Sequence, residues 1–343
     1  MRRVTIDDVA RRAHVSKATV SAVLNHRDVV RADTRRLVLK AIRDLHYRPR
    51  PSARNLKSSY TVPSIIHLLI RELDNPFYST LALGVIQYAS EKGYMVSVTS
   101  SEGSHAREEE ITQAFSHREI KGAIIAPVLQ GTAEIEHLFR LKMINFPFVL
   151  LERVTGIQAN VVAIDNIKAM DEAMKYLISN GHTRIVHFAG PDHASHTYER
   201  TEGFKRAYME SALAFTNDLV VPVGGHLESG YDKCLAYFEQ RSRAEYPTAI
   251  VCYNDLVALG VMSALHKMNI AVPDVVSVIG NDDIPFSEHT PVRLTTVRAP
   301  MRAMGRKAAE ILIRNIESGG TLPVENVVLD AELVVRESTR PIP

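Results

Sequence analysis

The side chains with the clearest chemical capacity lie near the amino terminus, and that capacity is for hydrogen bonding and charge pairing. Hydroxyl, ammonium, amide and methyl groups follow closely along one stretch, at Ser16, Lys17, Ala18, Thr19, Ser21, Ala22 and Asn25. Groups of these kinds bind phosphate oxygens and the edges of bases. Further along, Arg54 and Lys57 flank an apolar Leu56 within the basic stretch 48–57. The pattern predicts a surface that binds nucleic acid.

Two short helices joined by a tight turn are predicted to carry these side chains. Thr5 and Asp8 have the spacing of a capping box at the start of the first helix, and Ser16 is placed to cap the second. Apolar residues recur at helical spacing in three stretches, at Ile6, Val9, Ala10 and Ala13, then Val20, Val23 and Leu24, then Leu37, Val38, Ala41, Ile42 and Leu45. This arrangement is typical of a helix-turn-helix, whose second helix presents its amino-terminal end to base edges.

Charge is distributed very unevenly along the chain. Residues 1–60 hold 15 lysines and arginines against 5 aspartates and glutamates, a net charge of +10. The whole chain carries only +2, from 41 basic and 39 acidic residues, so residues 61–343 carry −8. A basic segment displaces counterions from DNA phosphates, whereas an acidic body is repelled by them. The asymmetry favours a DNA-binding arm attached to a body with a different role.

Several short runs in this arm match a known family: Val4-Thr5-Ile6-Asp7-Asp8-Val9-Ala10, Val15-Ser16, Thr19-Val20-Ser21, Val23-Leu24-Asn25, Thr34-Arg35, Tyr47-Arg48-Pro49, Ala53-Arg54 and Leu56-Lys57. On these residues the chain resembles the lac-repressor (LacI/GalR) family of bacterial transcription regulators. The resemblance implies base contacts in the major groove from Lys17, Ala18 and Ala22. It implies that Leu56 enters the minor groove, where an apolar wedge kinks the duplex. The other DNA-contacting residues that it implies are Thr5, Ser16, Thr19, Ser21, Asn25, Thr34, Tyr47, Ala53, Arg54 and Lys57.

The recognition helix departs from the family pattern in its base-reading side chains. Ala22 is small where several relatives carry a long polar residue, and Ala18 is small as well. Lys17 is therefore the one long polar reader in this helix, and lysine favours guanine. Two interpretations stay open: recognition of a specific, pseudo-palindromic operator, and sequence-tolerant architectural binding.

The remaining residues, 61–343, are too many for one ordinary domain and suit two. Apolar runs alternate with helical stretches, at 64–70, 77–92, 94–99, 121–128, 147–151, 161–165, 169–180, 184–189, 201–213, 231–240, 249–253, 256–268 and 275–280. The runs are rich in Val, Ile and Leu, as in strands buried on both faces of a parallel sheet. This alternation predicts an α/β core of two doubly wound parallel-sheet lobes behind an all-α helix-turn-helix domain.

The resemblance implies a periplasmic-binding-protein-like core in which the chain crosses between the lobes three times. We place these crossings near Asp165, Arg293 and Leu322. The expected domains are a helix-turn-helix domain over 1–46, a hinge helix or linker over 47–60, and an effector-binding and dimerisation core over 61–343. The first lobe is expected to cover about 61–164 and 294–321, including a helix over 301–318. The second lobe is expected to cover about 165–293 and 322–343, including 327–335.

Side chains at the carboxyl ends of the strands are candidate ligands for a small molecule, because open α/β sheets bind at that edge. The candidate effector-binding residues are Phe77, Tyr78, Ala194, His196, Arg200, Asn254, Asp255 and Asp282. Arg200 resembles the arginine with which the family holds ligand hydroxyls or carboxylates. Asn254 and Asp255 are equally well placed to cap the helix that follows them and to balance its dipole.

Recognisable catalytic motifs are missing from the sequence, including the P-loop, G-x-S-x-G and H-E-x-x-H. Cys234 and Cys252 lie in apolar stretches and are predicted to be reduced core thiols. His193 and His196 have H-x-x-H spacing, but no Cys or carboxylate accompanies them at ligand spacing, so we expect no metal and no other cofactor. The missing catalytic motifs predict a protein that is not an enzyme. The sequence shows neither a signal peptide nor a membrane span, which predicts a cytoplasmic protein.

The combined prediction is a ligand-responsive transcription regulator that acts as a repressor. A homodimer would bind a pseudo-palindromic operator in double-stranded DNA, under the control of a sugar, sugar phosphate or nucleobase-like effector in the cleft between the lobes. The alternatives are an architectural DNA-binding protein, a solute-binding protein-like sensor without a specific operator, and an enzyme with a DNA-binding arm. Steep salt dependence with little sequence preference would indicate the first alternative.

Overall fold

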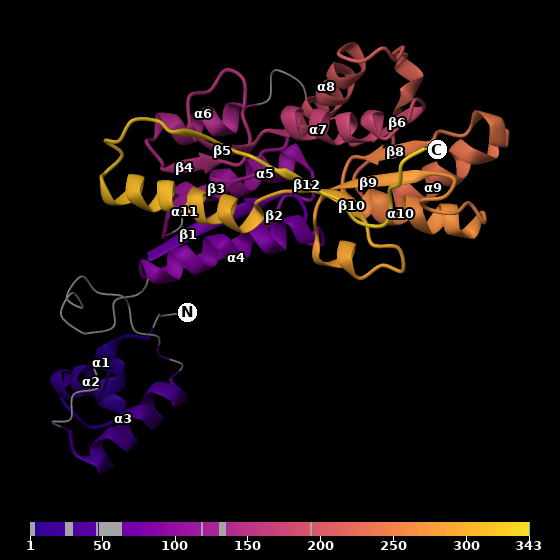
Figure 1. Ribbon diagram of the computed structural model, residues 1–343. Helices are drawn as coiled ribbons and strands as arrows, with labels where there is room; N and C mark the ends of the chain where they lie inside the picture. The colour runs from indigo at the N-terminus through magenta and orange to yellow at the C-terminus, as the bar shows by residue number, and fades with distance from the viewer. Residues whose placement is uncertain are drawn as a thin grey trace. The chain divides into compact units, whose positions relative to one another are not determined.

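The computed structural model describes residues 4–24, 30–45, 47, 64–117, 119–129, 135–192 and 194–342. The chain divides into two compact units, Met1–Val62 and Pro63–Pro343. Figure 1 shows the three helices of the first unit and the α/β elements of the second. Five residues that are predicted to contact DNA lie outside the described residues: Asn25, Ala53, Arg54, Leu56 and Lys57.

The first unit is built from helices α1 (Ile6–Arg12), α2 (Lys17–Leu24) and α3 (Ala32–Asp44). The Asp8 carboxylate accepts a hydrogen bond from the Thr5 backbone N–H at 2.9 Å, as in a capping box. Ser16 Oγ accepts one from the Thr19 N–H at 3.1 Å, which confirms it as the cap of α2. His14 has φ of 54° in the turn between α1 and α2, a left-handed conformation that allows the tight reversal.

The three helices bury a small apolar core, as the spacing predicted, with Val9, Val20 and Val38 fully buried. Leu37 was predicted to belong to this core, but it is 55% exposed. It precedes Val38 by one residue, which turns it about 100° around α3 and away from the other helices.

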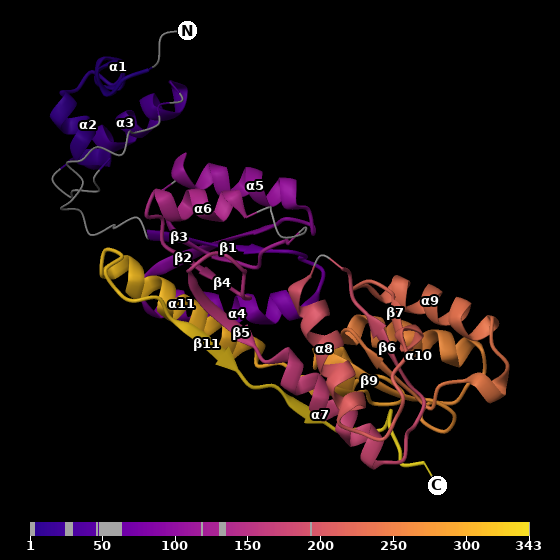
Figure 2. The same ribbon diagram turned by 90° about the horizontal axis from the view of Figure 1, so that it is seen from above.

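The first lobe of the core is a six-stranded parallel sheet with helices on both faces. Its strand order is β11-β5-β4-β3-β1-β2. These strands are β1 (Ser64–Ile70), β2 (Tyr94–Ser100), β3 (Ile120–Ile125), β4 (Phe148–Leu150), β5 (Asn160–Ile164) and β11 (Asn326–Leu329). The helices are α4 (Pro76–Glu91), α5 (His105–Gln113), α6 (Glu136–Met143) and α11 (Met301–Glu317). Helices α4 and α11 cover one face and α5 and α6 the other (Figure 2).

The second lobe repeats this architecture with strand order β12-β10-β9-β8-β6-β7. Its strands are β6 (Ile185–Ala189), β7 (Val220–Pro222), β8 (Ala249–Cys252), β9 (Ser277–Asp282), β10 (Thr295–Arg298) and β12 (Glu332–Val334). Its helices are α7 (Asn166–Ser179), α8 (Ser195–Met209), α9 (Leu227–Glu239) and α10 (Asp255–Lys267). Strand β12 runs antiparallel to β10, and the other described pairs in this sheet are parallel.

The described part of the chain passes between the lobes at three places. The sequence analysis predicted the position of the first passage correctly. The first passage lies between β5 and α7, at Asp165. The second follows Arg298, and not Arg293, because β10 first pairs with β9 in the second sheet. The third follows Leu329, and not Leu322. The predicted assignment of 327–335 to the second lobe is therefore wrong for its first half, because β11 pairs with β5 and only β12 reaches the second sheet.

No helix among the described residues is both long and apolar enough to cross a membrane.

Candidate functional site

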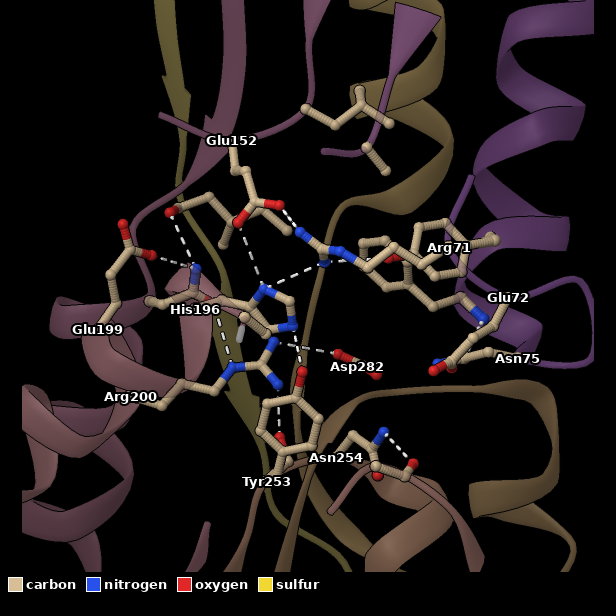
Figure 3. A pocket seen from close by; sticks show the side chains of 18 of the residues that line it. Arg71, Glu72, Asn75, Glu152, His196, Glu199, Arg200, Tyr253, Asn254 and Asp282 are labelled. Atoms are coloured by element: carbon tan, nitrogen blue, oxygen red, sulfur yellow. Dashed lines mark hydrogen bonds and ion pairs between the residues drawn. The ribbon is translucent and has the colours of Figure 1, made fainter. Parts of the chain in front are cut away.

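A pocket of about 850 Å³, including the part open to solvent, lies between the two lobes. Both sheets contribute the residues that follow their strands, as expected for α/β folds. The charged and polar side chains that line it are Arg71, Glu72, Asn75, Glu152, Asn166, His196, Glu199, Arg200, Asn254 and Asp282. The larger apolar and aromatic side chains of the lining are Phe77, Tyr78, Leu151, Ile164, Tyr253 and Met304. Figure 3 shows Arg71, Glu152 and His196 directed toward one another, and Arg200 directed toward Asp282.

Arg200, on the first turns of α8, organises the second-lobe side of the pocket. Its guanidinium donates through Nε to Asn166 Oδ1 at 3.2 Å, through Nη1 to the Tyr253 carbonyl, and through Nη2 to Asp282 Oδ1 at 3.4 Å. It also lies over the Tyr253 ring, 5.0 Å from the centroid. Asn166 in turn donates to Glu199 Oε2 at 2.7 Å. These contacts fix a planar array of donors and acceptors that suits a ligand with several hydroxyl groups.

Asp282 is a buried carboxylate at the end of β9, with 4% of its surface exposed. Its φ of 119° is uncommon for a residue with a side chain, and it aims the carboxylate at Arg200. Asn281 Nδ2 also donates to Asp282 Oδ1, at 2.9 Å. Burial raises the pKa of Asp282 to about 7, against the opposing effect of the Arg200 charge. Burial likewise raises the pKa of Glu199 above its ordinary value.

Arg71 and Glu152 form the first-lobe side of the pocket. Arg71 follows β1, and its guanidinium forms an ion pair with Glu152, which follows β4. Arg71 also donates to the Pro127 carbonyl, from Nε at 2.9 Å and from Nη2 at 2.6 Å, and to the Tyr78 hydroxyl at 3.2 Å. Only 8% of the Arg71 side chain is exposed, so its orientation is fixed by these partners.

Polar contacts also cross the pocket from one lobe to the other. Glu152 of the first lobe accepts a hydrogen bond from Ser195 of the second and lies 3.6 Å from His196 Nδ1. Arg71 Nη1 lies 3.4 Å from the same His196 nitrogen. His196 Nε2 pairs with the Tyr253 hydroxyl, and their rings stack with centroids 5.3 Å apart. Side chains of the two lobes are therefore in direct contact across this pocket.

Seven of the eight residues predicted for effector binding line this pocket: Phe77, Tyr78, Ala194, His196, Arg200, Asn254 and Asp282. Asn254 also caps the helix that follows it, which is the other role predicted from the sequence. Its Oδ1 accepts from the Val257 N–H at 2.9 Å and so caps α10, while its Nδ2 donates to the Gly225 carbonyl at 2.9 Å.

Asp255 does not line the pocket, so its predicted place among the effector ligands is wrong. It is fully buried behind the pocket, where its carboxylate accepts from Ser287 Oγ at 2.6 Å, the Ile284 N–H at 2.8 Å, and Thr296 Oγ1. A Cβ at Gly280 would stand 2.2 Å from Asp255 Oδ1, so only glycine lets β9 pass this close. Asp255 therefore supports the turn after Asp282 and does not contact a ligand.

The sequence analysis did not identify four further residues that line the pocket: Arg71, Glu152, Glu199 and Tyr253. Arg71, Glu152 and Tyr253 lie within two residues of the carboxyl end of a strand, which is the rule that identified Asn254 and Asp282. Applied evenly to every strand, the same rule would have found them. Nothing in the sequence pattern distinguishes Glu199 from an ordinary charge on a helix surface.

The predicted DNA-contacting residues that are described belong to all three helices. Lys17, Ala18, Thr19, Ser21 and Ala22 lie on α2, Thr34 lies on α3, and Tyr47 follows α3. The Lys17 ammonium is 3.1 Å from Asp7 Oδ2 of α1. The Lys17 side chain is 61% exposed, which leaves it accessible to a groove. Thr5 and Ser16 are helix caps, so contacts to phosphates would come from helix amino termini, which attract anions.

Comparisons of this chain with family models and with known proteins all indicate the same family. The model of bacterial regulatory proteins of the lacI family matches residues 5–50, and a periplasmic binding protein-like domain matches residues 174–339. The HTH-type transcriptional repressor PurR of Vibrio vulnificus is 32% identical, over 98% of this chain and 99% of its own. The ribose operon repressor of Halalkalibacterium halodurans is 32% identical, over 98% and 97%.

A solved structure extends the likeness to the whole fold. The complex of transcriptional regulator CelR with cellobiose has a TM-score of 0.73 at 28% identity, covering 98% of this chain and 100% of that one. The helix-turn-helix unit and the two-lobed core indicate the same family as the two repressors, which match over 98% of this chain. The chain therefore belongs to the lacI family of bacterial regulatory proteins, as a DNA-binding transcriptional regulator whose operator binding is controlled by a small polar effector.

Proposed function

We propose that the effector is a neutral sugar, and that it binds between Arg200 and Asp282 on one side and Arg71 and Glu152 on the other. The observation that carries this proposal is the charge of the pocket. Its lining holds two guanidinium groups, Arg71 and Arg200, and four carboxyl groups, Glu72, Glu152, Glu199 and Asp282. Both guanidinium groups already have carboxylate partners. A phosphorylated or carboxylated ligand would add a further negative charge to a partly buried acidic site, which is unfavourable.

The pocket also has the mixture of surfaces that sugars require. Carboxylates accept hydrogen bonds from hydroxyl groups, and side-chain amides can both accept and donate them. The rings of Phe77, Tyr78 and Tyr253 offer apolar faces to the C–H side of a sugar ring. Two relatives also support a sugar as the effector. The 28% identical regulator was solved with cellobiose, and a 32% identical relative is a ribose operon repressor.

The helix-turn-helix unit supplies the output of this sensor. Within it, Lys17, Ala18 and Ala22 are proposed to contact bases, and Thr5, Ser16, Thr19, Ser21, Thr34 and Tyr47 the backbone of the operator. We propose that the protein represses transcription as a homodimer in the cytoplasm, with one arm on each operator half-site. The repressor relatives and the exposed apolar residues along β2 and α4, including Met95 and Ile86, support this part.

Isothermal titration calorimetry with matched ligands tests the proposed effector class. Neutral sugars from a panel that includes ribose and cellobiose are compared with the corresponding sugar phosphates and with purine bases. We expect one or more neutral sugars to bind, and the phosphate of the same sugar to bind at least about tenfold more weakly, since a factor of ten equals about 1.4 kcal/mol. Binding of a sugar phosphate or purine in preference to every neutral sugar would overturn the assignment.

A matched pair of variants locates the binding site. Arg200→Lys keeps the charge but loses the planar set of donors that reaches Asn166, Tyr253 and Asp282. It should therefore abolish most sugar binding. Arg206→Lys lies on the same helix with its side chain 57% exposed and paired to Glu210, so its sugar affinity should equal that of the wild type.

A further inference from the structure

A buried pair of titratable side chains lies outside the pocket, between α5 and α6. Glu108 is fully buried and His137 is 2% exposed. His137 Nε2 lies 2.7 Å from Glu108 Oε1. Burying a carboxylate is unfavourable, and a buried pair of this kind is often no more stabilising than apolar residues of similar volume. The pair therefore calls for a role other than stability.

The other carboxylate oxygen of Glu108 connects the pair to the pocket. Glu108 Oε2 accepts a hydrogen bond from the Val128 N–H at 2.8 Å. The carbonyl of the same peptide group belongs to Pro127, and it accepts from Arg71 Nε at 2.9 Å and from Arg71 Nη2 at 2.6 Å. One peptide group thus lies between a buried carboxylate and the guanidinium that faces the pocket.

The two charges act on this peptide in the same direction. A negative charge at the N–H end and a positive charge at the C=O end both align with the peptide dipole, so each hydrogen bond polarises and strengthens the other. Both are charge-assisted bonds in a buried setting, where such bonds are stronger than neutral ones. Ala126, one residue earlier, lines the pocket, and its N–H is held by the Leu69 carbonyl at 2.8 Å. The segment that leaves β3 is therefore fixed from both sides.

We propose that Glu108, held by His137, is a positioning residue that fixes the Arg71 guanidinium for the effector through the Pro127–Val128 peptide. Arg71 is then left with Nη1 directed at the Tyr78 hydroxyl and toward His196, and with Nη2 on Glu152. The importance of Arg71 for the effector rests on the function proposed above. The positioning itself does not, and it can be measured without any sugar.

The first experiment follows the Arg71 Nε–H proton by NMR in the full-length protein, with its signal assigned by its loss in Arg71→Lys. Glu108→Gln keeps the size of the side chain and removes its charge. We expect solvent exchange of the Arg71 Nε–H to become about tenfold faster, as when a charge-assisted hydrogen bond is weakened by about 1.4 kcal/mol. Glu109→Gln is the matched control, because Glu109 is the next residue of α5 and pairs with Arg140 at the surface. It should leave the exchange unchanged.

A second pair of variants keeps the test decisive if Glu108→Gln does not fold. His137→Gln retains a donor near the position of Nε2 and should preserve the slow exchange, whereas His137→Leu lacks the donor and should lose it. Exchange of the Arg71 Nε–H within twofold of the wild type in Glu108→Gln, or in His137→Leu, would overturn the proposal.

The second experiment asks whether the positioning reaches the ligand, using whichever neutral sugar binds the wild type in calorimetry. A double-mutant cycle compares Glu108→Gln, Arg71→Met and the double variant. If Glu108 acts through Arg71, Glu108→Gln weakens sugar binding about tenfold alone but has no further effect when Arg71 is already Met. Equal losses in both backgrounds would contradict a role through Arg71. If no neutral sugar binds any variant while the exchange result holds, the proposed effector class is wrong and the positioning stands.

Discussion

Asp282 illustrates how single residues set the chemistry of this pocket. Burial raises its pKa to about 7, whereas Arg200 Nη2 and Asn281 Nδ2 favour the ionised form. The folded-state pKa lies above the unfolded value, so the folded state holds more protons between the two values. The contribution of Asp282 to stability is therefore present at low pH and is lost as the pH rises toward 7. A ligand hydroxyl that donates to this carboxylate favours its ionised form.

We expect sugar affinity to rise with pH through the pKa of Asp282. Between pH 6 and pH 8 the increase should be about tenfold if only the ionised form accepts the hydroxyl. Calorimetry at constant ionic strength measures this, and Asp282→Asn should give a flat profile over the same range. A wild-type affinity that is independent of pH in this window would show that Asp282 is not a ligand of the sugar.

Asp255 is expected to contribute to stability through its three buried hydrogen bonds. Asp255→Asn removes the negative charge that strengthens the bonds from Ser287 Oγ, the Ile284 N–H and Thr296 Oγ1, and the amide N–H₂ cannot accept from the donor it faces. The loss of these charge-assisted bonds should lower the free energy of unfolding by about 2–4 kcal/mol, measured by urea denaturation. Asp274→Asn, which changes an exposed pair with Arg340, should alter it by less than about 1 kcal/mol. Equal effects of the two substitutions would refute the role given to Asp255.

At the scale of elements, α2 carries the residues that are proposed to contact bases, Lys17, Ala18 and Ala22. Lys17 is the long cationic side chain at its amino-terminal end, and the Asp7 carboxylate holds its ammonium 3.1 Å away. Exposed pairs of this kind are worth little, about 0–1 kcal/mol, so a guanine edge can compete for the lysine.

Lys17→Ala should reduce the preference for the selected operator over random DNA by about 1–3 kcal/mol. Lys40→Ala, on α3, serves as the control, and it should change specific and non-specific binding equally or not at all. Fluorescence anisotropy at one fixed salt concentration gives both affinities for each variant. An unchanged ratio of specific to non-specific affinity in Lys17→Ala would favour sequence-tolerant binding by this unit.

Most elements of the core were predictable from the sequence because buried parallel strands are nearly uninterrupted apolar runs. The end of the chain was harder. Residues 327–335 are mostly apolar and read as one segment in the sequence. Strands β11 and β12 nevertheless belong to different sheets, and only their pairing with β5 and β10 shows this. Strand β10 was assigned to the wrong lobe for the same reason, since pairing between distant segments has no local pattern.

Part of the candidate site was predictable because ligands of α/β folds bind at the carboxyl ends of the strands. Residues after strands and before helices, such as Asn254 and Asp282, were found in this way. The neighbouring Asp255 was not distinguishable from them, because one residue along α10 turns its side chain from the pocket to the core. The link from Glu108 to Arg71 depends on a peptide group of a third segment, which no sequence spacing records.

At the scale of the whole molecule, the proposed homodimer would place two arms, each of net charge +10, on one operator. Apolar side chains are exposed along the edge strand β2 and the adjacent α4: Leu83, Ile86, Met95 and Val98 are 49%, 40%, 56% and 37% exposed. An exposed apolar patch beside a sheet edge suits a dimer interface.

Met95→Glu should therefore weaken the dimer and, with it, operator binding, since each arm alone contacts only one half-site. Sugar affinity should be unchanged, because Met95 does not line the pocket. Sedimentation equilibrium measures the first effect and calorimetry the last. Met143→Glu is the control, as Met143 is 81% exposed at the end of α6, away from β2. A Met95→Glu protein that remains as dimeric as the control would place the interface elsewhere.

A neutral sugar in the pocket is expected to change the affinity of this protein for its operator. The most direct measurement is an anisotropy titration of a selected, pseudo-palindromic operator with the full-length protein, at one salt concentration, with and without saturating sugar. We predict a change in operator affinity of at least about fivefold in the wild type, which corresponds to about 1 kcal/mol of coupling, and none in Arg200→Lys. An operator affinity that saturating sugar leaves unchanged, in a protein shown by calorimetry to bind that sugar, would contradict the account.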